Sequence, residues 1–362
     1  MSWRTGRSAG PPRAEPGPPR AGSSSAAGRS ARAGLPAARP GRYARAVLLA
    51  RALRVLVAAT LVGAGVPGVL GVFGAWSWWL DLCAHFRVQY AGALLLALAL
   101  AAGLRRWRLL AVGAPLLALN LVALAPLAVP EDRSTTGPPL PLVHFNLLTS
   151  NRRHADVRAW ISASGAQLVL LQEVDPAWAA ALADVPGYRL LHALPRADNF
   201  GLALLLREGA APPLAVDVLD LAGLPALAVR LRHAGRSLAL LGLHTLPPVS
   251  ARNAAIRDAQ LAAAAAWAGA QRDAGAAPVL LGDFNATPFS AALAPLAAVG
   301  LRDSLEAGGL LAAGSWPDLP WPLRIAIDHC WHDPRLVARA RALGPALGSD
   351  HRPLRVDLAW AE

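Results

Sequence analysis

Two long stretches without any charged side chain stand out in the first third of the sequence. One covers residues 55–76 and the other covers residues 109–129. A helix needs about 20 consecutive apolar residues to cross the hydrocarbon core of a bilayer. Buried core helices of a soluble protein are the alternative, but uncharged runs of this length are rare in soluble folds. We therefore predict an α-helical membrane region over residues 44–129.

A shorter apolar run, residues 91–104, lies between these two stretches. Its length suits a re-entrant or tilted segment as well as a full crossing, which would give about three transmembrane helices. Arg residues concentrate before the first run and between the second and third runs. By the positive-inside rule, the N-terminus is then cytoplasmic and the C-terminal part lies outside the cytoplasm. If the middle run does not cross, this orientation inverts.

Basic charge is concentrated in the N-terminal part of the chain. Residues 1–139 hold 16 Arg and 4 acidic residues, whereas residues 140–362 hold 19 of each. Residues 1–43 are rich in Arg and Pro and cannot bury enough apolar surface to fold, which predicts a disordered cytoplasmic tail. The C-terminal part has no overall basic excess to drive nonspecific nucleic-acid binding, although a local basic patch remains an alternative.

The pattern changes after a Pro-rich segment, residues 130–141, which we interpret as an extended linker. From residue 142 to residue 362, short apolar runs alternate with helical patterns, which predicts one α/β domain. The expected helices cover residues 155–164, 177–183 and 251–270. The expected strands cover residues 142–146, 168–171, 201–206, 226–232, 238–243, 279–281, 325–328 and 354–358.

Residues suited to catalysis follow one of these strands directly. After the apolar run at 279–281 the sequence continues with Gly282-Asp283-Phe284-Asn285. Residues two apart in an extended chain point to the same side, so the carboxylate and the amide should lie together. Such a pair can grip a metal-bound phosphate while it orients a water molecule. An ordinary strand end with an Asx turn is the alternative interpretation.

Similar polar sites occur at the ends of five other expected strands. They are Asn146, Gln172-Glu173, His244, Asp328-His329 and Asp350-His351. Their convergence would form a cleft on one rim of a sheet sandwich. Oxygen ligands with few imidazoles favour Mg²⁺, with Mn²⁺ as the alternative, over zinc. Taken singly, each has an ordinary interpretation, such as a turn residue for Asn146 or a helix cap for Glu173.

Taken in this order, the motifs resemble the endonuclease/exonuclease/phosphatase superfamily, which has the DNase I-like fold. The resemblance covers about residues 140–362, and Gly314-Ser315-Trp316-Pro317 before Ile327-Asp328-His329 is similar to bacterial membrane-anchored members. It implies a four-layer α/β sandwich, with two mainly antiparallel sheets flanked by helices, preceded by the transmembrane region. Together with the apolar runs, the resemblance implies a multi-pass protein of the bacterial inner membrane. Its catalytic domain, residues 142–362, is then expected on the extracytoplasmic side.

The resemblance also implies which residues bind the metal and activate water. Glu173 matches the principal metal ligand, with Asn146 beside it and Asp350 as a further contributor. Asp283 matches the carboxylate that orients or deprotonates the attacking water. Asn285 matches the amide that holds a phosphate oxygen.

The remaining implied roles concern histidines and the substrate cleft. His351 matches the catalytic imidazole, and Asp328 matches the carboxylate that fixes its tautomer and favours its charged form. His244 matches a second imidazole that contacts the phosphate near the leaving group. Asn199, just before Phe200, is a candidate substrate-binding residue in the cleft.

These features predict a membrane-anchored, Mg²⁺-dependent phosphodiesterase or phosphatase. The substrate is left open between lipid, small-molecule and nucleic-acid phosphoesters, and no obligate protein partner is implied. An endonuclease acting on DNA or RNA is one alternative. A catalytically inactive, membrane-held binding module on the same fold is another, although it predicts erosion of the motif set, which is intact here.

Overall fold

The computed structural model describes residues 41–127, 133–309 and 313–362. The chain divides into two compact units, Met1–Leu48 and Leu49–Glu362, and every tertiary contact below lies within the second. The tail predicted to be disordered, residues 1–43, falls almost entirely outside the described residues. No structural statement about that tail follows.

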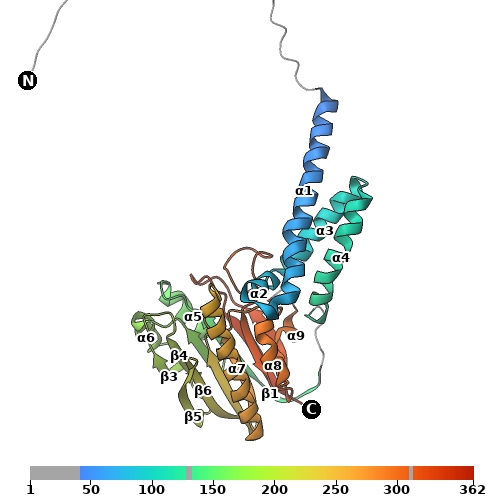
Figure 1. The fold of residues 1–362 in the computed structure, drawn as a ribbon. Coiled ribbons are helices and arrows are strands. Elements are labelled where there is room, and N and C mark those ends of the chain that lie inside the picture. The colour runs from blue at the N-terminus through green and yellow to red at the C-terminus, as the bar shows by residue number, and fades with distance from the viewer. Residues whose placement is uncertain (1–40, 128–132, 310–312) are drawn as a thin grey trace, which may run out of the picture. The chain divides into compact units, whose positions relative to one another are not determined.

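The described chain begins with helices, drawn in blue and teal in Figure 1. They are α1 (Arg42–Leu70), the 3-10 helix η1 (Gly71–Trp76), α2 (Trp78–Ala84), α3 (Arg87–Gly103), α4 (Trp107–Leu124) and the short 3-10 helix η2 (Ala125–Leu127). Leu61 and Leu98 belong to the apolar cluster between the long helices. A Cβ at Gly113 would lie 2.6 Å from Leu98 and 2.7 Å from Leu61, so a larger residue there would require the ends of these two side chains to move.

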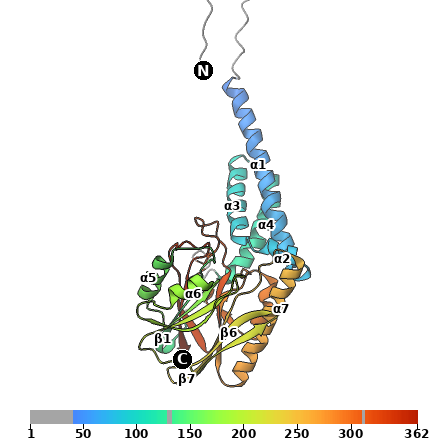
Figure 2. The same ribbon diagram turned by 90° about the vertical axis from the view of Figure 1, so that its left-hand side faces the viewer.

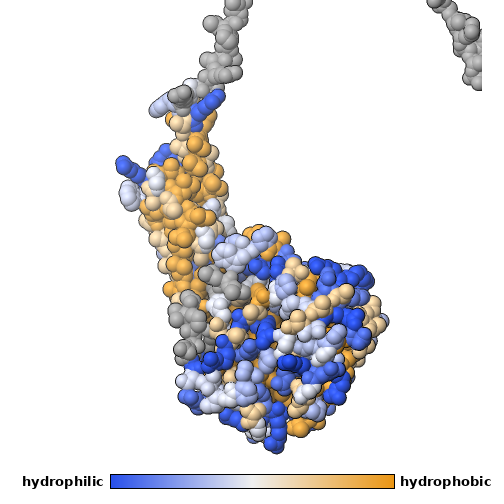
Figure 3. Space-filling view, turned by 180° about the vertical axis from the view of Figure 1, so that it is seen from behind, coloured by the Kyte–Doolittle hydropathy of each residue, from blue (hydrophilic) through white to orange (hydrophobic). Residues whose placement is uncertain are grey.

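Two helical segments, Tyr43–Trp76 and Trp107–Leu127, are long and apolar enough to cross a membrane. Helices α2 and α3, which meet at a bend of 56°, would together supply a third crossing. Hydrophobic side chains cover most of the visible helix surface, shown in orange in Figure 3. The number of crossings and their orientation remain predictions from the sequence.

Residues from Thr135 onward form two six-stranded mixed sheets. In spatial order the first contains β11 (Leu336–Leu343), β12 (Leu354–Ala361), β1 (Thr135–Asn146), β2 (Leu168–Gln172), β4 (Leu202–Arg207) and β3 (Tyr188–Leu194). The second contains β5 (Ala215–Leu221), β6 (Leu224–His233), β7 (Arg236–Leu243), β8 (Ala277–Asp283), β10 (Asp328–His332) and β9 (Arg302–Asp303). Only the pairs β1–β2 and β7–β8 are parallel.

Alternation along the strands gives each sheet two apolar faces. Leu142 of β1 and Val279 of β8 belong to the core between the sheets, whereas Val143 faces the opposite way into a second core. Helices cover both outer faces, which confirms the predicted four-layer α/β sandwich (Figure 2). They are α5 (His154–Ser164) and α6 (Pro176–Leu182) on the first sheet, and α7 (Ala251–Asp273) and α8 (Ala294–Ala298) on the second. The short helices η3 (Ala291–Leu293) and α9 (Leu305–Gly308) complete the described elements.

The sequence missed four strands, and these are the four sheet edges: β3, β5, β9 and β11. An edge strand buries less of its surface, so its apolar pattern is weaker. The strand predicted at residues 325–328 is wrong, because β10 starts at Asp328 and its buried histidines interrupt the apolar pattern. Strand β1 starts at Thr135, inside the predicted linker, where it pairs with β12. The domain boundaries themselves remain predictions.

Candidate active site

The candidate site lies where the apolar interface between the two sheets ends. Along β1, Leu142 points into that interface. Because alternate residues of a strand lie on the same face, His144 and Asn146 share the face of Leu142. Along β8, Leu281 points into the interface and Asp283 follows on the same face. Strands from both sheets therefore deliver polar side chains to one rim of the sandwich.

Asp283 is the centre of this group. Its Oδ2 lies 3.6 Å from Nε2 of His244, 3.6 Å from Nε2 of His351 and 3.4 Å from Nδ2 of Asn146. Its Oδ1 accepts a hydrogen bond from the backbone N of Asn285 at 2.9 Å. Four predicted site residues thus converge on one buried carboxyl group.

Two features fix the end of β8 that carries this carboxyl group. Gly282 has a φ of +152°, and a Cβ there would lie 2.0 Å from the carbonyl oxygen of Leu243. Only glycine permits this approach. Gln172, at the end of β2, bridges the sheets: its Oε1 accepts from the backbone N of Asp283 at 3.2 Å, and its Nε2 donates to Leu243 O at 2.8 Å.

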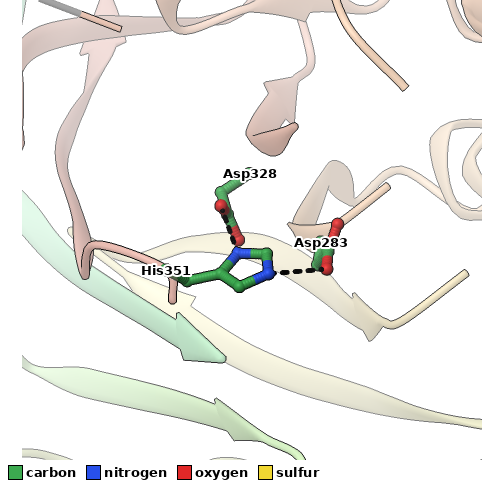
Figure 4. A group of neighbouring side chains, drawn as sticks. All are labelled: Asp283, Asp328 and His351. Atoms are coloured by element: carbon green, nitrogen blue, oxygen red, sulfur yellow. Dashed lines mark hydrogen bonds and ion pairs between the residues drawn. The ribbon is translucent and has the colours of Figure 1, made fainter. Parts of the chain in front are cut away.

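Asp328 binds two histidines. Its Oδ2 lies 2.9 Å from Nδ1 of His351, and its Oδ1 lies 2.8 Å from Nε2 of His144. Figure 4 shows the His351 ring between Asp328 and Asp283. In the antiparallel pairing of β10 with β8, Asp328 is directly opposite Asp283. The start of one strand therefore meets the end of the other at the same rim.

Burial and these neighbours set the charges of the histidines. Burial would lower the pKa of His351, but attraction to Asp328 and Asp283 raises it to about 10. For His244, burial and then the positive charge of His351 lower the pKa to about 3. Burial would raise the pKa of Asp328, yet His351 and His144 hold it well below its ordinary value. Near neutral pH, His351 is cationic, Asp328 is anionic and His244 is neutral.

Burial also shifts the pKa values of Asp283 and His144. Burial raises the pKa of Asp283 to about 7, against the opposing attraction of His351. A carboxyl group with a pKa near neutrality can both take and release a proton in the cell's pH range. Burial lowers the pKa of His144, so its neutral ring donates the Nε2 proton to Asp328.

A second part of the site is formed by Asn146 and Glu173. Nδ2 of Asn146 lies 3.0 Å from Glu173 Oε1 and 3.4 Å from Asp283 Oδ2, so it sits between two carboxyl groups. Thr149 steadies Glu173 by donating to its Oε2 from the backbone N at 3.1 Å and from Oγ1 at 3.3 Å. A position between two carboxyl groups favours positive charge, and the oxygen-rich set fits a hard divalent cation.

Another group of three side chains, Asp283, Asp328 and His351, has ligand atoms within 4.8 Å of one another. Both carboxylate oxygens of Asp328 and Nδ1 of His351 are, however, already engaged in hydrogen bonds. These bonds leave few free lone pairs for a cation. The oxygens of Glu173, Asn146 and Asp283 also accept hydrogen bonds, so both groups are candidates for holding a metal ion.

Asn285 and Asp350 make hydrogen bonds that limit the roles predicted for them. Nδ2 of Asn285 donates to the carbonyl oxygen of Thr245 at 2.8 Å, which uses one of its two amide hydrogens. Oδ2 of Asp350 accepts from Nε1 of Trp316 at 2.9 Å. Asp350 thus contacts the loop beside His351, and the described hydrogen bonds do not join it to Glu173.

Left-handed backbone recurs at three predicted site residues. Glu173 has a φ of +58°, Asn199 of +67° and Asn285 of +46°. Non-glycine residues in this conformation carry strain and cluster at functional sites. Asn199 is exposed, and the ring of the next residue, Phe200, packs on His244 at 4.9 Å between centroids. Asn199 therefore lies at the edge of the group.

Several residues that support the site were missed by sequence reasoning. His144 gave a usable signal, because it precedes Asn146 by two residues in the same strand and so shares its face. Gln172 was named only as the residue before Glu173, without a role, and Thr149 gave no distinguishing signal, since both act through contacts made only in the fold. Arg257 of α7 gave no signal either, and the structure buries it against Asp81.

Comparisons with known proteins agree with this architecture. A model of the Endonuclease/Exonuclease/phosphatase family matches residues 143–351. A functionally unknown conserved protein from Enterococcus faecalis V583 is 20% identical, with a TM-score of 0.52 over 61% of this chain and 99% of its own. An endonuclease/exonuclease/phosphatase from Bacteroides vulgatus is 19% identical, with a TM-score of 0.52 over 62% of this chain and 100% of its own.

A further similar structure is humanized TDP2 from D. rerio, which is 17% identical, with a TM-score of 0.50 over 61% of this chain and 98% of its own. At these identities the likeness concerns the fold alone. No match was found among curated protein sequences.

Proposed function

This chain belongs to the endonuclease/exonuclease/phosphatase family, and on that premise we propose that it is a membrane-anchored phosphoester hydrolase that uses a divalent cation, Mg²⁺ in the first place. The proposal rests on the groups that surround the Asp283 carboxyl group. Its Oδ2 faces two imidazole nitrogens at 3.6 Å and the amide that links it to Glu173. A proton acceptor, a cationic donor and a candidate cation site thus share one small space.

Hydrolysis requires a nucleophilic water and stabilisation of negative charge on phosphorus. Asp283, with a pKa of about 7, can orient a water molecule and accept its proton. The cationic Nε2–H of His351 faces the same space and can donate to a non-bridging phosphate oxygen. Asp328 holds the ring from behind through Nδ1.

His244 and Asn285 complete the proposed binding of the phosphate. His244 is neutral, and its Nε2 lies 3.6 Å from the same Oδ2 of Asp283 that faces His351. It can form a hydrogen bond near the leaving group. Asn285 keeps one amide hydrogen beyond the bond to Thr245 and can donate it to a phosphate oxygen.

The proposed metal ligands are Glu173 and Asn146, with Asp283 beside them as the carboxylate that orients the water. When bound, a divalent cation supplies Lewis acidity and neutralises part of the phosphate charge. Thr149 orients Glu173 for this task, as outer partners of metal ligands commonly do. Carboxylate and amide oxygens support Mg²⁺ or Mn²⁺ rather than zinc.

The proposed division of the chain is a tail at 1–43, a membrane region at 44–129, a linker at 130–141 and a catalytic domain at 142–362. Two helices of sufficient length and apolarity support the membrane anchor. The excess of Arg before the first span supports an extracytoplasmic catalytic domain in a bacterial inner membrane. The even charge of the catalytic domain favours a lipid or small phosphoester over nucleic acid.

The test uses the full chain purified in detergent. It should hydrolyse bis(p-nitrophenyl) phosphate or p-nitrophenyl phosphate with Mg²⁺ and lose the activity in EDTA. Asp283→Asn should lower the rate by about a hundredfold or more, since it removes the proton acceptor. Asp217→Asn, on the exposed edge strand β5, is the matched control. Full activity in Asp283→Asn, or in EDTA, would overturn the proposal.

A further inference from the structure

One loop of the catalytic part is bound to the candidate membrane helices. Nε2 of Gln89 donates to the carbonyl oxygens of Pro322 at 2.7 Å and of Arg324 at 3.0 Å. Gln89 lies in the first turn of α3, one half of the bent helix pair that could cross a membrane. We call residues 316–324 the surface loop. This contact holds the surface loop beside the first turn of α3, at the end of a candidate span.

The surface loop also reaches the candidate active site. At its start, Nε1 of Trp316 donates to Asp350, and the Trp316 ring lies 6.5 Å from the His351 ring. Backbone bonds between Trp316 and Ile325 close the loop at its base. The same short segment therefore touches the candidate span at one end and the neighbour of the catalytic imidazole at the other.

Apolar side chains project from the tip of the surface loop. Leu319, Trp321 and Leu323 are 46%, 50% and 56% exposed. Exposed apolar clusters of this kind mark sites of interaction. Trp76 and Trp79, just before α3, are also exposed, and Trp is enriched where a protein meets the membrane surface. Exposed apolar side chains are thus found both on the loop and on the helices to which it is hydrogen-bonded.

A second contact fixes the catalytic part against the helices. Arg257 of α7 donates from Nη2 to Asp81 of α2 at 3.1 Å, and both side chains are buried. Ser290 Oγ and the backbone N of Ala291 donate to the same carboxylate at 2.7 and 2.8 Å. Figure 1 shows α2 beside α7 and α8. Arg257 also contacts the carbonyl oxygen of Asn285 at 3.4 Å, so this contact ends beside the candidate site.

From these contacts we propose that the surface loop inserts its apolar tip into the lipid surface and that the site hydrolyses a phosphoester in the headgroup of a membrane lipid. The inference rests on the proposed hydrolase function. Water adds to phosphorus, the bond from phosphorus to the leaving oxygen breaks, and that oxygen receives a proton. Lipid is the occupant because the loop is continuous with helices whose outer faces are already apolar.

The first experiment compares lipid and soluble substrates. The full chain is reconstituted in vesicles containing phosphatidylethanolamine, phosphatidylglycerol, sphingomyelin and phosphatidylinositol phosphate, and products are followed by mass spectrometry. The double variant Leu319→Ser/Leu323→Ser should cleave lipid roughly tenfold more slowly, since it removes two apolar side chains that would enter the lipid. Its cleavage of bis(p-nitrophenyl) phosphate should be unchanged. Leu214→Ser, at an exposed leucine outside the loop, is the control.

The second experiment measures insertion without activity. Leu319→Cys in a Cys83→Ser background is spin-labelled, while Cys330 is fully buried and stays unlabelled. In lipid nanodiscs the label should collide more with oxygen than with an aqueous nickel complex. A label at Leu214→Cys should show the opposite preference. Equal aqueous accessibility at both positions would overturn the insertion of the loop.

The two proposals fail in different ways. If neither soluble ester nor any lipid is cleaved, the hydrolase function is wrong. If the soluble ester is cleaved with Mg²⁺ but every lipid stays intact, or the loop variant cleaves lipid at the rate of the control, only the lipid inference is wrong. Cleavage of lipid that depends on Leu319 and Leu323 supports both.

Discussion

His144 lies 2.8 Å from Asp328, with Nε2 of the ring donating to Oδ1 of the carboxylate inside the closed sandwich. The other oxygen of Asp328 holds His351. Three residues from three strand ends thus form a continuous hydrogen-bonded row from the core to the site. Its inner end is a neutral donor and its outer end is a cation.

Replacing His144 tests whether this row supports the site. His144→Leu would leave a buried carboxylate oxygen without its donor, which should reduce the free energy of unfolding by about 1–3 kcal/mol. The rate of hydrolysis should fall as well, because Asp328 no longer holds His351 in place. His144→Gln keeps an N–H donor and should lose less of the free energy of unfolding. Thermal unfolding of the full chain in detergent measures the first effect, and His192→Leu on the edge strand β3 is the control. Equal losses in the Leu and Gln variants would contradict the expectation.

Asp328→Asn should change the charge of His351. In the wild-type protein the pKa of about 10 keeps the imidazole cationic at pH 8. Without the neighbouring carboxylate, burial should lower that pKa by roughly two units or more. Histidine NMR titration of the full chain in detergent, assigned with His351→Gln, measures the shift. An unchanged midpoint in Asp328→Asn would show that other groups hold the proton on His351.

The raised pKa of Asp283 predicts how stability depends on pH in the metal-free protein. Its folded pKa of about 7 lies above the ordinary 3.8, so its contribution is full below pH 3.8 and is lost as pH rises through 7. Asp283→Asn mimics the neutral acid, so at pH 8 in EDTA it should have a higher melting temperature than the wild type. This gap in melting temperature should narrow toward pH 4. Adding Mg²⁺ should shrink the gap at pH 8, because a cation favours the carboxylate. A gap independent of both pH and Mg²⁺ would refute this account.

Glu173→Gln should weaken divalent cation binding by at least about tenfold, because the candidate site loses one of its two carboxylates. Binding of Mn²⁺ to the full chain, followed by electron paramagnetic resonance, gives the affinity directly. Glu208→Gln, on an exposed turn, removes the same charge elsewhere and should bind normally. Equal affinities in the two variants would place the cation elsewhere.

The ion pair between Arg257 and Asp81 predicts a non-additive double-mutant cycle. Arg257→Met alone leaves a buried carboxylate with fewer donors and should reduce the free energy of unfolding by about 3–5 kcal/mol. Asp81→Leu alone should cost a similar amount. The double variant should lose less than the sum, since both charges are gone. Thermal unfolding of the four proteins measures the coupling, and strictly additive losses would deny it.

Much of the fold followed from local patterns in the sequence. The apolar runs of α1 and α4 were found because they are long and without charge, although most of their side chains are exposed in the structure. The central strands of both sheets were found because burial on both faces leaves a continuous apolar signal. Edge strands such as β5 and β11 were not found, because half-exposed strands have mixed composition. Strand β10 was displaced in the prediction because Asp328, His329 and His332 are polar yet buried.

The sequence alone indicated which groups are candidates for the chemistry and that they stand near strand ends, since periodicity and motif order are properties of the linear chain. Only the tertiary structure decided that Asp283 faces two imidazoles, that His144 stands behind Asp328, and that Arg257 turns inward to Asp81. Those relationships join residues far apart in the chain. Their geometry depends on how two sheets and the helices pack, which no local pattern encodes.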